Sequence, residues 1–450
     1  MRSSFFFNDP APPEIYTLSL HDVFRSEVPV RFTSILKKLV GVTQLYVHGI
    51  AMDRDDEMSV EVTPAWRKPR CAECGRRAVQ YDHPPSVGRW QDLNWGPIRI
   101  YLVYRCRRVT CVRCGGRPRN ALVPWAATGT KYTHRMEELT AFLARQTDIT
   151  SVTQILGIAW RTVGRIVRRI GEARLDPQRY TGLTRIGVDE FSYRKRHHYL
   201  TVVLNHDTGK VVWAATGKNS ETLRTFFDLI GPEQCAGIQL VTIDMSAAYE
   251  KAITDRLPNA TIIFDRFHVQ QLSTNAVEAV RRDQQRALWN AGDPDEAKVT
   301  KGTRFSLLKN PWNLTLEQGR KLSAVLRNNV QLFRAYLLNQ TLAGALDDRQ
   351  PKRARRALDD WLSWACRSKL APFVKVSRTI RAKKEGVLAN IWERLTNGIV
   401  EGTNNRLRMI ARRAFGFHSP EALIAMLYLS CGGIELHPPL PQRHVDFRDI

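Results

Sequence analysis

Long apolar runs are missing from this sequence of 450 residues. No window approaches the roughly 18 to 20 uncharged apolar residues that a membrane-spanning helix needs. The one apolar cluster near the start, residues 5–7, is followed at once by Asn8, Asp9 and Pro10, which is not the pattern of a signal peptide. Internal repeats and low-complexity segments are missing too. We therefore expect a globular, cytoplasmic protein, and the chain length suggests about three domains.

Acidic residues are scarce relative to basic ones. The chain carries 44 Asp and Glu against 68 Lys and Arg, a formal net charge of +24. Residues 352–413 alone hold 16 Lys and Arg against five Asp and Glu. Surplus positive charge favours binding to a polyanion, because neutralising phosphates releases their counterions. Nucleic acid is the first candidate partner, although ribosome-bound proteins and proteins with arginine-covered helices share this composition.

The eight cysteines are too unevenly spaced for a disulfide framework. Five of them fall within 44 residues: Cys71, Cys74, Cys106, Cys111 and Cys114. The spacing of Cys71 and Cys74, followed by Gly75, is that of a knuckle in which two thiolates face one tetrahedral ion. The second knuckle has three cysteines for two positions, so spacing alone leaves the fourth ligand open. We expect a structural zinc site that staples a small β-ribbon domain over residues 31–122.

A helical pattern covers residues 133–171, and Gly157 separates two short helices within it. Apolar positions on both helices can form one core, while three arginines project from the second helix: Arg161, Arg165 and Arg168. The pattern predicts a helix-turn-helix domain, placed at residues 125–180, whose second helix can enter a DNA major groove. The alternative is an ordinary helical hairpin with a solvated basic face.

Strand signals dominate after Pro177. Apolar runs at 185–191, 199–204 and 210–216 predict an antiparallel meander. Two further strands, at 238–244 and 260–265, alternate with helices, which is the order of an RNase H-like sheet. Strand signals largely vanish between 287 and 390, so an all-helical insertion is expected there.

The predicted fold class is therefore α+β and multidomain: a zinc-stapled β-ribbon, a helix-turn-helix domain and an RNase H-like α/β catalytic core with a helical insertion. The remaining boundaries are a poorly ordered extension at 1–30, core segments at 183–286 and 391–432 around the insertion at 287–390, and a tail at 433–450.

Two strands of the predicted sheet end in a carboxylate. Asp189 lies on the first strand and Asp244 closes the fourth, and these strands are neighbours in an RNase H-like sheet. Two buried carboxylates repel each other, and a divalent cation relieves that repulsion. Two magnesium ions about 3.5 to 4 Å apart would suit phosphoryl transfer. Taken alone, the two residues are equally compatible with turn caps or a salt-bridged pair.

A third carboxylate is needed for such a site. Glu401 is the best candidate, because it begins a helix whose following residues are basic and amide-rich. Glu190 and Asp265 compete with it. Strand alternation points Glu190 to the face opposite Asp189, whereas Asp265 ends the next strand and can approach the same site.

Four segments carry further motifs: Ile186-Gly-Val-Asp-Glu-Phe-Ser-Tyr193, Thr242-Ile-Asp-Met-Ser-Ala-Ala-Tyr249, Phe264-Asp-Arg-Phe-His-Val269 and Asn397-Gly-Ile-Val-Glu-Gly-Thr-Asn-Asn-Arg-Leu-Arg408. In this order they resemble the ISL3 family of bacterial insertion-sequence transposases, and the resemblance covers nearly everything after about residue 35. It implies a nucleoid-associated DDE transposase. Such an enzyme binds the terminal inverted repeats of its element and catalyses metal-dependent strand cleavage and strand transfer.

The same resemblance assigns the site residues. The triad falls on Asp189, Asp244 and Glu401, which would hold magnesium or manganese, with Asp265 and His268 as accessory residues. The second cysteine knuckle of the family matches Cys106 and Cys111, to join Cys71 and Cys74 on zinc, and Cys114 stays an alternative to Cys111.

DNA is the expected partner, as inverted-repeat ends and as target. Because a mobile element has two ends, a homodimer or a larger homo-oligomer is expected. Groove contacts are predicted for the three arginines of the second helix, and a phosphate channel for a further set: Arg381, Lys383, Lys384, Arg406, Arg408, Arg412 and Arg413.

Two rival functions fit parts of the pattern. A DNA-binding transcriptional regulator would use the same zinc and helix-turn-helix modules without catalysis. An RNase H-like nuclease would cut DNA without joining it.

Overall fold

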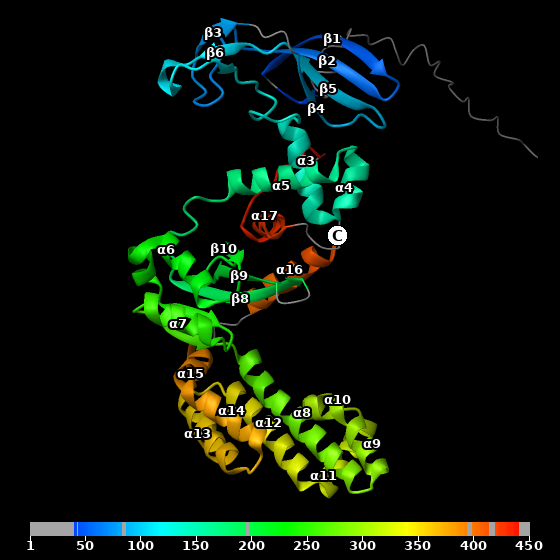
Figure 1. Cartoon of the computed structure of the whole chain (residues 1–450), viewed down its shortest axis with the longest axis vertical. Helices are drawn as coiled ribbons and strands as arrows, with labels where there is room; N and C mark the ends of the chain where they lie inside the picture. Colours follow the sequence, from blue (N-terminus) through cyan, green and yellow to red (C-terminus); the bar gives the residue numbers. More distant parts are fainter. Residues whose placement is uncertain are drawn as a thin grey trace, which may run out of the picture. The chain divides into compact units, whose positions relative to one another are not determined.

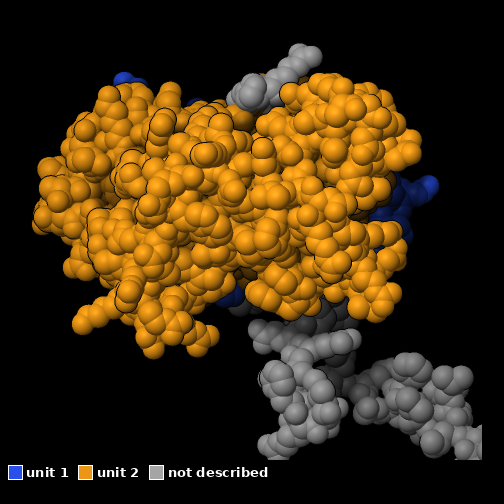
Figure 2. Space-filling model, turned by 90° about the horizontal axis from the view of Figure 1, so that it is seen from below, with its two compact units in different colours: residues 1–140, 437–450 blue, residues 141–436 orange. Residues whose placement is uncertain are grey.

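The computed structural model describes residues 40–42, 44–82, 87–194, 198–393, 398–413 and 419–440. The chain divides into two compact units, unit 1 with residues 1–140 and 437–450 and unit 2 with residues 141–436, coloured separately in Figure 2. The expected extension at 1–30 and the end of the expected tail, from residue 441, lie outside the described residues. None of the helices in the described ranges combines the length and apolar composition that crossing a bilayer requires.

Unit 1 contains a four-stranded sheet of strand order β1-β2-β5-β4. Its strands are β1 (Leu45–Arg54), β2 (Glu57–Pro64), β4 (Gly88–Gln91) and β5 (Arg99–Tyr104). In β5 every second side chain is buried, because successive side chains of a strand point to opposite faces of the sheet. The buried side chains pack around Trp125, whose ring makes T-shaped contacts with those of Trp90 and Tyr104.

A second, smaller sheet of unit 1 has the order β3-β6-β7. It consists of β3 (Val79–Asp82), β6 (Arg108–Thr110) and β7 (Arg119–Asn120). A short 3-10 turn, η1 (Val112–Cys114), lies between β6 and β7. This sheet has few buried apolar residues, so side-chain packing alone contributes little to its stability.

Three helices follow, α3 (His134–Gln146), α4 (Ile149–Leu156) and α5 (Trp160–Arg174). The Asp148 side chain accepts a hydrogen bond from the Ser151 N–H and so caps α4. Gly157 ends α4 in the left-handed conformation (φ 64°), which glycine adopts without steric cost. The buried face of α5 includes Val163, Ile166 and Val167, apolar positions that the sequence predicted for the core of this domain.

The sheet of unit 2 has five strands in the order β10-β9-β8-β11-β12. They are β8 (Arg185–Arg194), β9 (His198–Asn205), β10 (Val211–Thr216), β11 (Leu240–Ile243) and β12 (Thr261–Phe264). Strands β8, β9 and β10 pair antiparallel, and β11 then pairs parallel with both β8 and β12. The predicted meander and the two strands after it are confirmed.

Helices connect the parallel strands and continue beyond them. α6 (Ser220–Gly237) and α7 (Ala247–Arg256) pack on the sheet, and α8 (Arg266–Asn290) leads away from it (Figure 1). The helical character predicted for residues 287–390 is confirmed by α9 (Pro294–Gly302), α10 (Arg304–Leu308), the 3-10 turn η2 (Pro311–Asn313), α11 (Leu316–Asn328), α12 (Val330–Asp347), α13 (Pro351–Arg367), α14 (Ala371–Ala382) and α15 (Lys384–Glu393).

This helical segment shares one hydrophobic core with the sheet. Buried side chains of α12–α15 and of the sheet belong to the same cluster. The two approach closely at Gly386 of α15, where a Cβ atom would lie 2.6 Å from the ring of Phe264. Of these helices α15 packs onto β12, and the whole helical segment belongs to the same compact unit as the sheet.

Two helices complete unit 2, α16 (Gly398–Arg413) and α17 (Pro420–Cys431). α16 lies against β8, and α17 packs on α5 and β10 (Figure 1). The Ala214 N–H of β10 donates to the Tyr428 hydroxyl at 3.0 Å, which fixes α17 to the sheet. The chain thus returns from the helical segment to the strand that carries Asp189.

Candidate active site and metal-ligating cluster

Asp189 and Asp244 stand at the same level of neighbouring strands. β8 and β11 pair in parallel register up to Gly187 and Thr242, and each aspartate comes two residues later. Asp244 accepts the Ser246 N–H at 3.0 Å, a local turn that starts α7. Asp189 accepts the N–H of its neighbour Glu190 at 2.6 Å. Parallel pairing thus brings two carboxylates to one edge of the sheet.

A cavity of about 370 Å³ opens beside Asp244. It is lined by Glu190, Lys218, Asp244, Met245, Ser246, His268, Gln271, Leu272 and Asn275. Its α8 wall presents residues three and four positions apart, which is the spacing of one helix face. Asp189 is not among the lining residues, whereas its neighbour Glu190 is. Of the two competitors for the third carboxylate, Glu190 therefore lies beside Asp244.

Negative charge crowds this cavity. Burial raises the pKa of Glu190 above its usual value, and Lys218 opposes that shift. The carboxylates of Asp244 and Asp189 raise it further. Burial also raises the pKa of Tyr249, and the same three carboxylates add to the rise. Hard oxygen ligands that repel one another are the donor set that a divalent cation suits.

Asp265 and His268 lie next to each other at the start of α8. Asp265 caps the helix by accepting the Phe267 N–H at 3.0 Å, and it does not line the cavity. Its other carboxylate oxygen lies 3.8 Å from His268 Nε2. Asp265 therefore stands behind His268, which does face the cavity.

Glu401 is in the first half of α16, the helix against β8. Its side chain lies outside the described residues. The backbones of the three predicted triad residues therefore lie on β8, directly after β11 and on α16, and β11 and α16 both contact β8.

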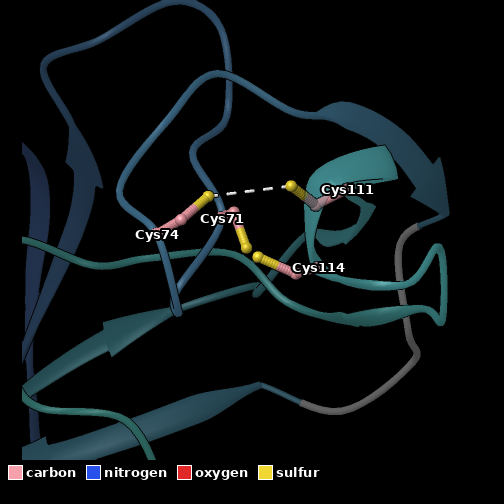
Figure 3. A group of neighbouring side chains, drawn as sticks. All are labelled: Cys71, Cys74, Cys111 and Cys114. Atoms are coloured by element: carbon pink, nitrogen blue, oxygen red, sulfur yellow. Dashed lines mark hydrogen bonds between the residues drawn. The ribbon is translucent and has the colours of Figure 1, made fainter.

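Four cysteines form the one group of three or more candidate ligands that converges within the described ranges. The Sγ atoms of Cys71, Cys74, Cys111 and Cys114 all lie within 4.8 Å of one another, and their side chains point inward in Figure 3. Cys74 Sγ and Cys111 Sγ are 3.7 Å apart. A zinc tetrahedron with bonds of about 2.3 Å separates its sulfurs by about 3.8 Å. The quartet has the dimensions of a zinc site.

The structure corrects the predicted ligand set, because Cys106 is not in the quartet. Its Sγ lies 3.8 Å from the Tyr104 carbonyl oxygen, and burial raises its pKa. The reason is local: β6 begins between Cys106 and Cys111, whereas Cys111 and Cys114 share the turn η1. Cys114 therefore joins Cys111 and does not replace it. The sequence contained a signal for the correct ligand pair, since Cys71 and Cys111 each begin the same Cys-x-x-Cys-Gly pattern.

Local hydrogen bonds make that pattern a tight knuckle. The Gly75 N–H donates to the Cys71 carbonyl, and the Gly116 N–H to that of Cys111, both at 2.9 Å. Gly75 has φ 68°, a conformation that other residues adopt only with strain. Desolvation and the neighbouring thiols raise the pKa of Cys114. Four clustered thiols cannot all ionise unless a cation neutralises them.

Some of the basic residues predicted to bind DNA are exposed, and others form ion pairs within the protein. Arg161, Arg165 and Arg168 are exposed on α5, spaced so that they lie along one side of the helix. Among the predicted channel residues, Lys383 pairs with Glu250 and Lys384 with Asp359, so these two charges are partly neutralised within the protein.

The arginines of α16 also differ, because two of them donate hydrogen bonds to backbone carbonyls of other helices. Arg413 donates to the carbonyls of Arg145 and Gln146, at 3.3 and 3.0 Å, and so caps the end of α3. Arg406 donates to the Ser430 carbonyl at 3.4 Å. Arg408 and Arg412 are exposed.

Comparison with known proteins decides the family. A family model described as "Transposase" matches residues 186–427, more than half of the chain, and one described as "Helix-turn-helix domain of transposase family ISL3" matches residues 121–171. The chain belongs to the ISL3 family of insertion-sequence transposases.

Individual relatives agree with this ISL3 assignment. The chain is 35% identical over 444 residues to the transposase for insertion sequence element IS1557 of Mycobacterium tuberculosis, covering 92% of this chain and 98% of the relative. It is 30% identical over 365 residues to the transposase for IS1001 of Bordetella parapertussis, covering 81% and 89%.

The family assignment confirms the resemblance seen in the sequence and the helix-turn-helix prediction. It also identifies this ISL3 transposase as a DNA-binding enzyme that cuts and transfers DNA strands. A regulator without catalysis is not favoured. The five-stranded sheet and the cavity at its edge lie within the matched catalytic region.

Proposed function

We propose that this transposase cleaves and joins DNA at the cavity beside Asp244, by a two-metal DDE mechanism. The observation that carries the proposal is the common level of Asp189 and Asp244 on parallel strands, next to a cavity with excess negative charge. α16 supports it, since that helix brings the backbone of Glu401 to β8.

In this mechanism Asp189, Asp244 and Glu401 would hold two divalent cations, magnesium or manganese. When bound, the cations supply activation of the attacking oxygen and stabilisation of the leaving oxygen. His268 lines the cavity with Asp265 behind it, so the pair can orient a group or accept a proton there. When the element end is cut, water attacks the phosphorus, a P–O bond to the water oxygen forms and the P–O bond to the 3′-oxygen breaks, which leaves a 3′-hydroxyl and a 5′-phosphate. On joining, the freed 3′-hydroxyl forms a new bond to a target phosphate, whose former 3′-oxygen leaves.

We also propose that the sheet with α6–α8 and α16 is an RNase H-like core, and that α9–α15 are an insertion between its second and third carboxylates. The order of three antiparallel strands followed by two parallel ones supports this. The boundaries predicted at residues 183–286, 287–390 and 391–432 differ slightly from this division, because α8 ends at Asn290 and α15 at Glu393.

DNA ends would be held by the helix-turn-helix and by the cysteine knuckles. The exposed Arg161, Arg165 and Arg168 of α5 are the proposed groove contacts, and Arg408 and Arg412 the proposed phosphate contacts. Structural zinc would be bound by Cys71, Cys74, Cys111 and Cys114. Two element ends call for a homodimer or larger assembly.

A strand-transfer assay tests the proposal. Pre-cleaved inverted-repeat ends are incubated with the protein, magnesium or manganese and a supercoiled target, and joined products are separated on a gel. Wild-type protein should join the ends. The Asp189→Asn variant should bind them with unchanged affinity and yield no product. Cutting without joining by the wild type would instead support the nuclease function, and joining by Asp189→Asn would remove that residue from the mechanism.

A further inference from the structure

Lys218 is the one lysine or arginine among the described residues that line the cavity. It lies in the short connection between β10 and α6, and it is exposed to solvent. Its charge lowers the pKa of Glu190, so the ammonium acts on the same space as the carboxylates. Neither the motifs nor the charge pattern of the sequence pointed to this residue.

The connection before Lys218 is fixed from two sides. The Gly217 N–H donates to the Tyr199 carbonyl at 2.9 Å, and the Thr201 hydroxyl donates to the Gly217 carbonyl at 2.9 Å. Because the Thr201 proton is used there, the Tyr249 hydroxyl, 2.9 Å from Thr201 Oγ1, is the donor of that hydrogen bond. Gly217 has φ 115°, and a Cβ atom on it would lie 2.3 Å from Thr222 Oγ1. Only glycine fits this position.

The connection after Lys218 is fixed as well. Asn219 caps α6 by accepting the Thr222 N–H at 2.8 Å. Lys218 is therefore the single residue between a constrained glycine and a helix cap. Its Nζ lies 3.7 Å from the centre of the Tyr199 ring, a cation–π contact that directs the ammonium. An ammonium has three N–H donors, and no described residue forms a hydrogen bond or ion pair with this one, so donors remain for a ligand.

We propose that Lys218 binds a nonbridging oxygen of the DNA phosphate that enters the cavity beside Asp244. The inference rests on the proposed function. Once cations neutralise the carboxylates, a phosphate is the anion that the cavity receives, and lysine binds phosphate as a point charge. The α8 wall of the cavity offers the amide side chains of Gln271 and Asn275, which can donate to the same strand. Thr201, Gly217 and Tyr249 keep the lysine in place.

The test compares single-turnover strand transfer by wild-type protein and three variants on pre-cleaved ends at saturating DNA. Lys218→Ala should lower the rate by at least about 10-fold, because an interaction that is stronger in the transition state is lost. Affinity for the inverted repeat should change less than about 3-fold, and Lys218→Arg should recover part of the rate. Lys251→Ala removes one exposed lysine from α7, outside the cavity, and should keep the wild-type rate.

Neutral phosphates identify the contact. Each phosphate around the reacting position is replaced in turn by an uncharged methylphosphonate. At one position the replacement should slow the wild type and cause no further loss in Lys218→Ala, because both changes remove the same contact. If the rate loss from the methylphosphonate adds to the rate loss from Lys218→Ala at every position, Lys218 contacts none of these phosphates. It then only offsets the charge of Glu190, and the inference is wrong.

The same assay distinguishes a failure of the proposed function from a failure of the Lys218 inference. If the wild type joins no ends, or Asp244→Asn still joins them, the active-site proposal falls and this inference with it. If both behave as proposed while Lys218→Ala matches Lys251→Ala, the Lys218 inference alone is overturned.

Discussion

Asp189 and Asp244 lie at the same level of two neighbouring parallel strands, although 55 positions separate them in the chain. Gly187 and Thr242 are the last residues that pair between these strands, and each aspartate comes two residues later. Neither strand would tolerate two neighbouring carboxylates for stability alone, because their charges repel. The arrangement is therefore expected to cost stability in the absence of cations and to serve catalysis in their presence.

Replacing Asp244 by Asn should abolish strand transfer and leave folding intact. The change keeps the shape of the side chain and removes its charge, so rates should fall by at least about 100-fold, since metal-ion stabilisation contributes several kcal/mol. Thermal unfolding without metal should occur at the same or a higher temperature. Asp228→Asn on α6, which removes an exposed carboxylate, is the matched control and should retain activity. Equal activity of the two variants would contradict the assignment.

The cysteine quartet predicts which thiol matters for metal binding. Cys114→Ser should lower bound zinc from about one ion per chain to well under one and reduce the thermal stability of unit 1, because ligand loss opens the tetrahedron. Cys106→Ser should keep the metal. Metal analysis of both purified variants, with thermal unfolding followed by circular dichroism, makes the comparison. Zinc loss in Cys106→Ser and not in Cys114→Ser would restore the ligand set first expected.

The sequence could predict the elements better than the contacts between them. Short apolar runs located the strands of unit 2, and Gly157 located the turn of the helix-turn-helix, because both signals are local. Cys106 was misassigned because a spacing does not say where a strand intervenes, and β6 does so. Glu190 was expected on the face opposite Asp189, and of the two only Glu190 lines the cavity. Strand alternation separates two faces, but it does not say which face a cavity adjoins, because that depends on how α8 packs beside the sheet.

The hydrogen-bond and ion-pair partners of the basic residues within the fold could not be predicted either, because they depend on contacts between distant parts of the chain. Arg413 was expected to contact DNA phosphates, and its hydrogen bonds go to carbonyls of residues 145 and 146, more than 260 positions earlier in the chain. No local pattern carries such a contact. Lys383 and Glu250 are a second example.

Arg413→Ala should destabilise unit 2, whereas Arg412→Ala should not. The last carbonyls of a helix have no partner within it, and Arg413 supplies one for two carbonyls of α3. Loss of these bonds should lower the unfolding free energy by about 1 kcal/mol. Both variants lose one exposed positive charge from the same helix end, so any loss of nonspecific DNA affinity should be equal. Urea denaturation and binding at several salt concentrations separate the two effects, and equal stabilities would show that the cap contributes nothing.

His206 should make unit 2 less stable in mild acid. Burial lowers its pKa, nearby Arg185 lowers it further, and Asp207 opposes the shift. In the fold, Nε2 is 2.6 Å from Thr242 Oγ1, while Nδ1 is buried without a partner among the described residues. A proton on the ring is thus disfavoured in the fold and accepted in the unfolded chain below pH about 6.5.

The unfolding free energy should consequently fall as pH drops below about 6.5, by at most about 1.4 kcal/mol per pH unit from this group. His206→Gln should reduce the difference in unfolding free energy between pH 7.5 and pH 5.5, measured by urea denaturation of the full chain. His198→Gln changes an exposed histidine at the start of β9 and should leave that difference as it is in the wild type. The same pH dependence in all three proteins would mean that His206 takes up its proton within the fold, and that the space around Nδ1 admits a hydrogen-bond acceptor for the charged ring.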